Sequence, residues 1–180
     1  MLNVFLIGPM GAGKSAVADV LEAQGYHRYA MATPIREMVR SAFPWAVGKA
    51  EQRAYMQQVG AFLRSFHPNP ILVHANTALT LAPVVIEDGR TQEEALWAHE
   101  KGMLVVVLDA TLEVRMKRVL KRDGALPDMR TLADNTEQDF AHVRALRFDT
   151  EQKSPEQIAA EILEKAGRDH DDASARKTGS

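Results

Sequence analysis

The feature that most constrains the fold of this chain is a glycine-rich segment near its N-terminus, Gly8-Pro9-Met10-Gly11-Ala12-Gly13-Lys14-Ser15. An apolar run, Leu2 to Ile7, precedes this segment, and a helical pattern, Ala16 to Leu21, follows it. A strand, a glycine-rich turn and a helix in this order make up the phosphate-binding P-loop. Backbone N–H groups of such a loop face the phosphates, its lysine reaches the terminal phosphates, and its hydroxyl ligates Mg²⁺. The sequence therefore predicts a nucleoside triphosphate ligand.

Composition limits the remaining possibilities. The chain has 180 residues, of which 46% are hydrophobic, so it can bury a full core as one compact domain. Its 22 basic and 24 acidic residues nearly balance, which argues against a nucleic-acid partner. The absence of cysteine excludes disulfides and thiolate zinc sites. No apolar run approaches the ~20 residues of a membrane span, so we expect a cytoplasmic protein with a small-molecule ligand and no membrane partner.

Strand and helix patterns alternate along the chain. Further strands are predicted at residues 27–31, 83–86 and 103–108. Helices are predicted at residues 33–43, 50–65, 92–101, 112–121 and 155–163, with another that ends at residue 81. Strands separated by helices indicate an α/β fold with a parallel sheet and right-handed crossovers. Residues 1–167 are expected to form a single domain, followed by a disordered polar tail at residues 168–180.

A second group of functional residues, Glu87-Asp88-Gly89-Arg90, follows the apolar run Val84-Val85-Ile86. Ligands of open α/β sheets bind at the carboxyl ends of strands, so this group is expected beside the P-loop. Asp88 is a candidate for holding Mg²⁺ through water, and Arg90 for gripping a phosphate with both guanidinium nitrogens. An ordinary solvated turn with an ion pair is the alternative interpretation.

A third group is a set of basic residues that follows the 103–108 strand. Arg115, Arg118 and Arg122 fall on one helical face, and Arg130 follows in the next loop. Such a face is suited to close over a triphosphate and to neutralise charge in the transition state. In isolation it is equally consistent with a solvated basic surface. Three methionines, Met31, Met38 and Met56, are expected to pack in the core.

Three segments together with the P-loop give the chain its resemblance to known enzymes. They are Ala32-Thr33-Pro34-Ile35-Arg36-Glu37-Met38, residues 57–68 with Arg64, and residues 84–95 with Asp88, Arg90 and Glu94. With them, the chain resembles the P-loop nucleoside monophosphate kinases over about residues 2 to 165, and most closely those bacteriophage enzymes that act on deoxynucleoside monophosphates. It departs from that family at Gly89 and Glu93, where the family often has an aliphatic residue and an asparagine.

The resemblance implies phosphoryl transfer from ATP, with Mg²⁺, to a (deoxy)nucleoside monophosphate. It also implies a P-loop NTPase fold of three layers with a five-stranded parallel sheet, an acceptor-binding helical region at about residues 32–81 and a lid at about residues 115–131. A monomer or homodimer in the cytoplasm, the host cytoplasm for a phage protein, is expected.

Residue roles follow from the motifs and from this resemblance. Lys14, Arg90, Arg118 and Arg122 are the expected catalytic residues. ATP is expected to contact Gly8, Met10, Gly11, Ala12, Gly13, Lys14, Ser15, Ala16 and Arg115. The acceptor is expected to contact Arg36, Arg64, Asp88, Arg90 and Glu94, and Mg²⁺ to be held by Ser15 and Asp88. An acceptor phosphate is already ionised, so this site needs positioning and charge neutralisation more than a general base.

Two alternatives remain open from the sequence. One is a P-loop kinase with a hydroxyl acceptor, such as a nucleoside, dephospho-coenzyme A or a sugar acid, in which Glu87 or Asp88 serves as the catalytic base. The other is a regulatory module that binds a nucleotide without transferring a phosphoryl group.

Overall fold

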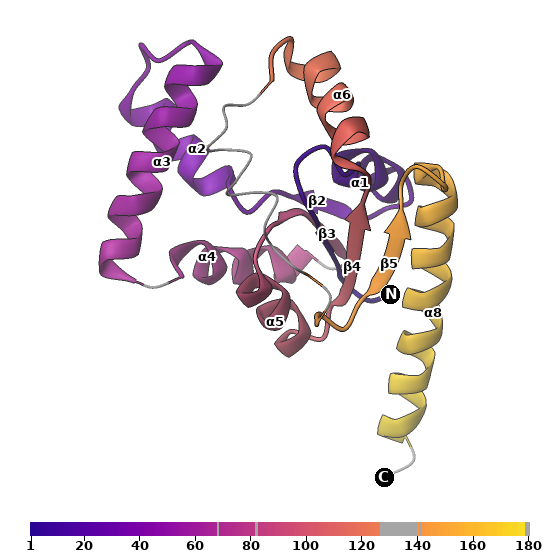
Figure 1. Cartoon of the computed structure of the whole chain (residues 1–180). Helices are drawn as coiled ribbons and strands as arrows, with labels where there is room; N and C mark the ends of the chain where they lie inside the picture. Colours follow the sequence, from indigo (N-terminus) through magenta and orange to yellow (C-terminus); the bar gives the residue numbers. More distant parts are fainter. Residues whose placement is uncertain (68, 82, 127–139, 141, 179–180) are drawn as a thin grey trace.

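A five-stranded parallel sheet forms the centre of the molecule (Figure 1). The computed structural model describes residues 1–67, 69–81, 83–126, 140 and 142–178. The strands are β1 Val4–Ile7, β2 His27–Tyr29, β3 Val84–Gly89, β4 Leu104–Asp109 and β5 Leu146–Asp149. Their order is β2-β3-β1-β4-β5, and every neighbouring pair is parallel. The predicted α/β class and five-stranded sheet are confirmed.

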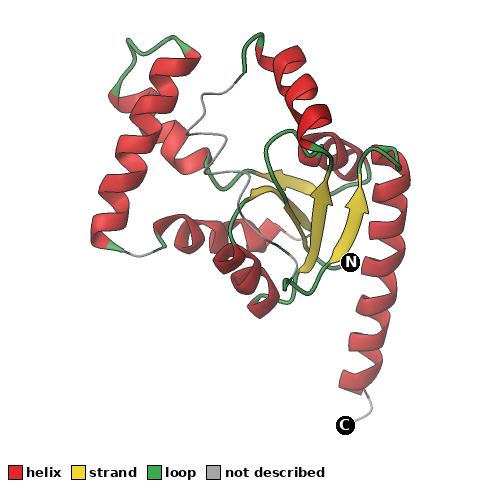
Figure 2. Cartoon of the chain, viewed as in Figure 1, coloured by secondary structure: helices red, strands yellow, loops and turns green. Residues whose placement is uncertain are grey.

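Helices cover both faces of the sheet, so the fold has three layers (Figure 2). Because successive strand residues point to opposite faces, β1 contributes to two separate cores. Val4 and Leu6 pack with α1 (Lys14–Ala23) and α8 (Pro155–Thr178). Phe5 and Ile7 pack with α4 (Pro70–Ala78) and α5 (Gln92–Glu100). All four β1 side chains are fully buried, which explains the unbroken apolar run in the sequence.

Two helices between β2 and α4 stand away from the sheet. They are α2 (Thr33–Ala42) and α3 (Lys49–Phe66), which pack on each other and lie on the opposite side of the sheet from α8 (Figure 1). A short 3₁₀ helix, η1 (Leu79–Leu81), follows α4. Helices thus occupy most of the described part of residues 32–81, and the acceptor-binding role expected of this region stays a prediction.

The last crossover begins with α6 (Leu112–Asp123), which ends at the left-handed Gly124. The predicted lid at about residues 115–131 coincides with α6 only in its first part. Its later part, with Arg130, lies outside the described residues.

The C-terminal helix is longer than we predicted. We expected disorder from residue 168, whereas α8 continues to Thr178. Residues 168–178 contain several good helix formers, among them Ala, Arg and Lys, and a helix that is already nucleated extends at little cost through such residues. None of the helices in the described ranges combines the length and the apolar composition that a membrane span requires.

Candidate active site

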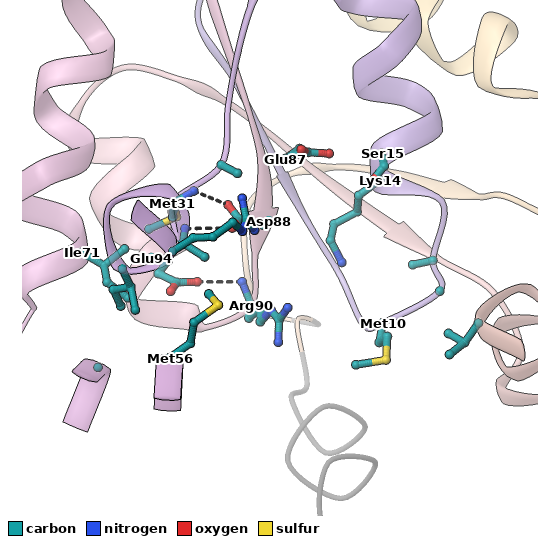
Figure 3. Close-up of a pocket in the computed structure, with 18 of the residues that line it drawn as sticks. Met10, Lys14, Ser15, Met31, Met56, Ile71, Glu87, Asp88, Arg90 and Glu94 are labelled. Atoms are coloured by element: carbon teal, nitrogen blue, oxygen red, sulfur yellow. Dashed lines mark hydrogen bonds between the residues drawn. The ribbon is translucent and has the colours of Figure 1, made fainter. Parts of the chain in front are cut away.

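A cavity of about 890 Å³ opens at the carboxyl ends of the strands. The P-loop, α2, α3 and the end of β3 surround it together with α6 (Figure 3). Its lining includes every residue expected to bind ATP, acceptor or metal except Gly8 and Arg115. The P-loop and the start of α1 contribute Met10, Gly11, Ala12, Gly13, Lys14, Ser15 and Ala16. Other elements contribute the predicted acceptor residues Arg36, Arg64, Asp88, Arg90 and Glu94, and the predicted catalytic residues Arg118 and Arg122.

The P-loop is pressed against the end of β4 and the start of α6. Gly8 and Gly11 have φ angles of 151° and 81°, a region that side chains rarely permit. A Cβ on Gly8 would collide with the Leu108 carbonyl oxygen, and one on Gly11 would lie 2.6 Å from the Arg115 carbonyl oxygen. The glycines are therefore required both by backbone conformation and by close packing.

Lys14 begins α1 and bends back over the P-loop. Its Nζ donates to the Pro9 carbonyl oxygen at 2.9 Å and to the Gly8 carbonyl oxygen at 2.5 Å. Burial, followed by the positive charge of Arg90, lowers the pKa of Lys14 to about 8, although Asp88 and Glu87 act in the opposite direction. The charged form of Lys14 is thus disfavoured in the free protein, and the negative charge of a bound triphosphate would stabilise it.

The lowered pKa predicts a pH dependence of ATP binding. Above pH 8 the free protein increasingly carries a neutral Lys14, so we expect the ATP dissociation constant to be flat from pH 7 to 7.5 and to rise about tenfold per pH unit once the pH is well above 8. Titration calorimetry from pH 7 to 9.5 measures this. Lys14→Arg keeps its proton over the whole range and is the matched control. An affinity that stays constant to pH 9.5 in the wild type would contradict the prediction.

Asp88 connects β3 to the start of α2. Its Oδ1 accepts a hydrogen bond from Met31 N at 2.7 Å and its Oδ2 from Ala32 N at 3.2 Å. Burial raises the pKa of Asp88, and the two N–H donors and Arg90 act against that rise. Both oxygens thus anchor the segment that leads into α2, a contact that the sequence did not predict, and the role of Asp88 in holding Mg²⁺ stays a prediction. Each oxygen still keeps a free lone pair for a further ligand.

Replacement of this anchor is expected to destabilise the protein. In Asp88→Asn the side-chain amide can accept from only one of the two N–H groups, and its NH₂ faces the other donor. We expect a loss of about 1–3 kcal/mol in the free energy of unfolding, the cost of leaving a buried donor unsatisfied. Urea denaturation measures it, with Glu100→Gln on the exposed part of α5 as control. Equal stability of both variants would show that the anchor is unimportant.

Glu87 faces the opposite side of β3 from Asp88. Arg28 on β2 grips its carboxylate with two hydrogen bonds, Nε to Oε1 at 2.8 Å and Nη2 to Oε2 at 2.6 Å. The same guanidinium also bonds to Asp19 on α1. Glu87 is paired with a positive charge, whereas Asp88 accepts from two neutral N–H groups, so Glu87 is the less suitable of the two candidate bases.

Glu94 lines the cavity from the first turn of α5. Its Oε2 accepts from Arg90 N at 2.6 Å and Thr91 N at 2.9 Å, while Thr91 Oγ1 accepts from Glu94 N, which completes a capping box. Burial raises the pKa of Glu94. The carboxylate thus holds the backbone of Arg90 in place. From the sequence we predicted only that Glu94 contacts the acceptor.

Three of the cavity arginines come from elements other than α6. Arg36 comes from α2, Arg64 from α3 and Arg90 from the end of β3. Within the described part of the chain, no carboxylate forms a salt bridge with Arg36 or Arg64. Since the cavity acids Glu87, Asp88 and Glu94 already accept hydrogen bonds from the protein, this end of the cavity is suited to an anion.

The α6 arginines divide into different roles. Arg118 Nη1 donates to Thr150 Oγ1 at 2.8 Å and to the Gly11 carbonyl oxygen at 3.3 Å, so it ties the P-loop to the segment after β5. Arg122 lines the cavity and pairs with Asp123 at 2.7 Å. Arg115 is only 7% exposed and donates to the Ala110 carbonyl oxygen, away from the cavity lining. We expected Arg115, Arg118 and Arg122 to reach the site from one face of α6, but only Arg118 and Arg122 line the cavity.

The cavity also has an apolar wall, which was not predicted from the sequence. Ile35 from α2, Met56 from α3 and Ile71 from α4 line it, together with Met31 (Figure 3). Met56 was expected in the core, but its helix stands off the sheet and turns this side chain toward the cavity. The four-residue spacing of Met56, Gly60 and Arg64 on one helical face was the available signal.

Comparison with known proteins agrees with this architecture. The family model of the AAA domain matches residues 4–142, which is more than half of the chain. The chain belongs to this AAA domain family. As a member of it, the chain has the P-loop kinase fold, with the sheet and flanking helices described above.

Relatives of this AAA domain chain include small-molecule kinases. The shikimate kinase of Lactococcus lactis is 28% identical over 176 residues, which cover 92% of this chain and 99% of that protein. A gluconokinase from Sinorhizobium meliloti superposes with a TM-score of 0.61 at 17% identity, covering 97% of this chain and 96% of its own. The shikimate kinase of Acinetobacter baumannii, solved with shikimate, gives a TM-score of 0.60 at 20% identity and covers 94% of each chain.

These matches support the P-loop kinase group as a whole. The narrower resemblance to bacteriophage deoxynucleoside monophosphate kinases stays a prediction, because the relatives named here are shikimate kinases and a gluconokinase.

Proposed function

We propose that this protein transfers the γ-phosphoryl group of ATP to the hydroxyl of a small anionic metabolite. The observation that carries the proposal is one cavity that brings together the P-loop, the partly buried carboxylate of Asp88 and five arginines, of which three come from α2, α3 and the end of β3. The proteins named above are shikimate kinases and a gluconokinase, and by those names their acceptors are shikimate and gluconate rather than nucleotides. This favours the hydroxyl-acceptor alternative over the nucleoside monophosphate kinase that the sequence resemblance implied.

The donor half of the cavity is suited to a Mg²⁺-bound triphosphate. Backbone N–H groups at the start of α1 attract phosphate, and Lys14 adds a nearby cation. Ser15 lines the cavity in the first turn of α1 together with the acids at the end of β3, a donor set that fits Mg²⁺ because this ion usually keeps several waters and takes few protein ligands. When bound, Mg²⁺ neutralises charge on the transferring group.

In the acceptor half, the three arginines would bind the anionic group of the metabolite. Arg36, Arg64 and Arg90 can donate paired hydrogen bonds to a carboxylate or a phosphate. The apolar wall would contact the carbon skeleton. Held in this way, the acceptor hydroxyl is brought next to the terminal phosphate, and positioning is a large part of catalysis in phosphoryl transfer.

Asp88 is the group proposed to receive the proton. The acceptor oxygen forms a bond to the γ-phosphorus, the bond from that phosphorus to the β–γ bridging oxygen breaks, and ADP leaves with the electron pair. The hydroxyl proton passes to the Asp88 carboxylate. Burial raises the pKa of Asp88, which makes it a stronger base than an exposed aspartate.

A nucleoside monophosphate is the second candidate acceptor. The specific observation in its favour is that Arg28 and two backbone N–H groups already engage both acids at the end of β3. An acceptor phosphate needs no base, and three arginines are suited to a dianion. In this version Glu94 is the candidate for contacting the nucleoside.

Steady-state ADP formation across an acceptor panel tests the proposal. The panel contains shikimate, gluconate, dephospho-coenzyme A, the nucleosides and all common ribo- and deoxyribonucleoside monophosphates. We expect one hydroxyl acceptor to raise ATP turnover at least about a hundredfold, and Asp88→Asn to remove most of that gain. Stimulation by a monophosphate that persists in Asp88→Asn would establish the second candidate. Turnover that no acceptor raises would favour a regulatory module.

A further inference from the structure

Gly60 occupies an unexpected place for a glycine. It lies inside α3, an 18-residue helix, where glycine is less favourable than any residue but proline. Gly60 is buried, and it also lines the cavity. A helix interior has no need of the backbone freedom that glycine provides, so the reason lies in the space that a side chain would fill.

The neighbours of Gly60 define that space. A Cβ built on it would lie 3.4 Å from Arg64 Nη1, 3.7 Å from Arg64 Nη2 and 3.5 Å from Ile35 Cδ1. Long side chains on a helix lean toward its N-terminus, and residues four apart are neighbours on its surface. The guanidinium of Arg64 therefore lies back over the bare backbone at Gly60, beside the Ile35 side chain of α2.

This arrangement gives Arg64 a defined place in the cavity. The guanidinium contacts α3 on one side, and Arg64, Ile35, Met56 and Gly60 all line the same cavity. Arg64 makes no salt bridge within the described part of the chain, so its hydrogen-bonding groups stay available for a ligand.

We propose that Gly60 is a specificity-determining position of the acceptor half: its missing side chain seats the Arg64 guanidinium against α3, where it binds the anionic group of the acceptor, and sets the depth of the cavity beside Met56. The inference rests on the proposed function for the identity of the acceptor. Arg64 is the residue that contacts the ligand, and Gly60 is a positioning residue that acts through it.

Side chains of increasing size test the position. Alanine fits, because 3.4 Å is an ordinary van der Waals distance, so Gly60→Ala is expected to keep the acceptor KM within about threefold and to raise Tm slightly. The leucine side chain of Gly60→Leu would fill the space that the Arg64 guanidinium occupies beside Gly60 and would displace the guanidinium. We expect its acceptor KM to rise at least about tenfold, the effect of losing one charge-assisted hydrogen bond, while the KM for ATP is unchanged.

Two comparisons separate this role from simple helix packing. Gly167→Ala makes the same change within α8, where nothing lies within 4 Å of the added Cβ, and should leave both KM values unchanged. In an Arg64→Met background, Gly60→Leu should raise the acceptor KM no further, because the group it displaces is gone. An additive effect in that background, or a lowered Tm in Gly60→Ala, would overturn the proposal.

A binding measurement keeps the inference independent of turnover. With the P-loop filled by a non-hydrolysable ATP analogue, inorganic phosphate is titrated while the Arg64 Nε–Hε signal is followed by NMR. The signal should shift in the wild type and in Gly60→Ala, and should not shift in Gly60→Leu. A shift in a protein that phosphorylates no compound of the panel would refute the proposed function and support this inference; an unmoved wild-type signal would refute the inference.

Discussion

Lys14→Ala is expected to lower kcat by at least about a hundredfold without unfolding the protein, since removal of one preorganised electrostatic group in an active site costs this much. Lys14 Nζ bonds to carbonyl oxygens of the P-loop itself, Gly8 and Pro9, and takes no part in either apolar core. Its charge is therefore needed for the phosphates rather than for the fold. Single-turnover transfer and the far-UV circular dichroism spectrum measure the two parts of this prediction.

The control for this variant is Lys101→Ala, which removes an exposed lysine after α5 that does not line the cavity. It should keep wild-type kcat and wild-type Tm. If Lys14→Ala turned over at a near-native rate, the assignment of the glycine-rich loop as the phosphate site would be wrong. If it failed to fold, Lys14→Met, which keeps the apolar stem, would take its place.

Arg90→Lys is expected to raise the acceptor KM by about one to two orders of magnitude although the charge is kept. An ammonium group cannot form the paired hydrogen bonds of a guanidinium, and a hydrogen bond to a charged group contributes about 1.5–3 kcal/mol. The backbone of Arg90 is held by Glu94, so the loop itself should not move. Steady-state kinetics with each substrate varied separately measures the change.

Arg40→Lys is the matched control for Arg90→Lys. Arg40 lies on the exposed part of α2 and does not line the cavity, so the same substitution should leave both KM values unchanged. An equal loss of ATP affinity in Arg90→Lys would move this residue to the donor site. Arg90 lies close enough to Lys14 for its charge to lower the pKa of the lysine, so a contact between Arg90 and ATP is the alternative that this measurement distinguishes.

The sheet was predictable because its central strands are continuous apolar runs. Residues 103–108 of the prediction agree with β4 to within one residue at each end. The strand β5 was not found from the residues, because the edge segment Leu146-Arg147-Phe148-Asp149 alternates with charge and is only four residues long. Gly89, a departure from the family pattern, is explained by Phe5, whose ring fills the space of a side chain there.

The positions of site residues were easier to predict than their contacts. The spacing of the glycine-rich motif between a strand and a helix predicted the positions of Lys14 and Ser15, and the end of an apolar strand predicted those of Asp88 and Arg90. The hydrogen bonds from Met31 N and Ala32 N to Asp88 join segments 56 and 57 residues apart, a distance over which periodicity carries no information. Such long-range contacts are set by packing of the two segments in the folded chain.

The most direct test of the account follows the phosphoryl group itself. The wild-type protein is incubated with Mg²⁺, [γ-³²P]ATP and the pooled acceptor panel, and labelled products are separated by chromatography. We predict label in a phosphoester of one hydroxyl acceptor, dependent on Lys14 and Asp88. Label in a nucleoside diphosphate would show that the protein is a kinase whose acceptor is a nucleoside monophosphate rather than a hydroxyl compound. Label found only in ATP and inorganic phosphate would contradict the claim that this cavity transfers a phosphoryl group between two small molecules.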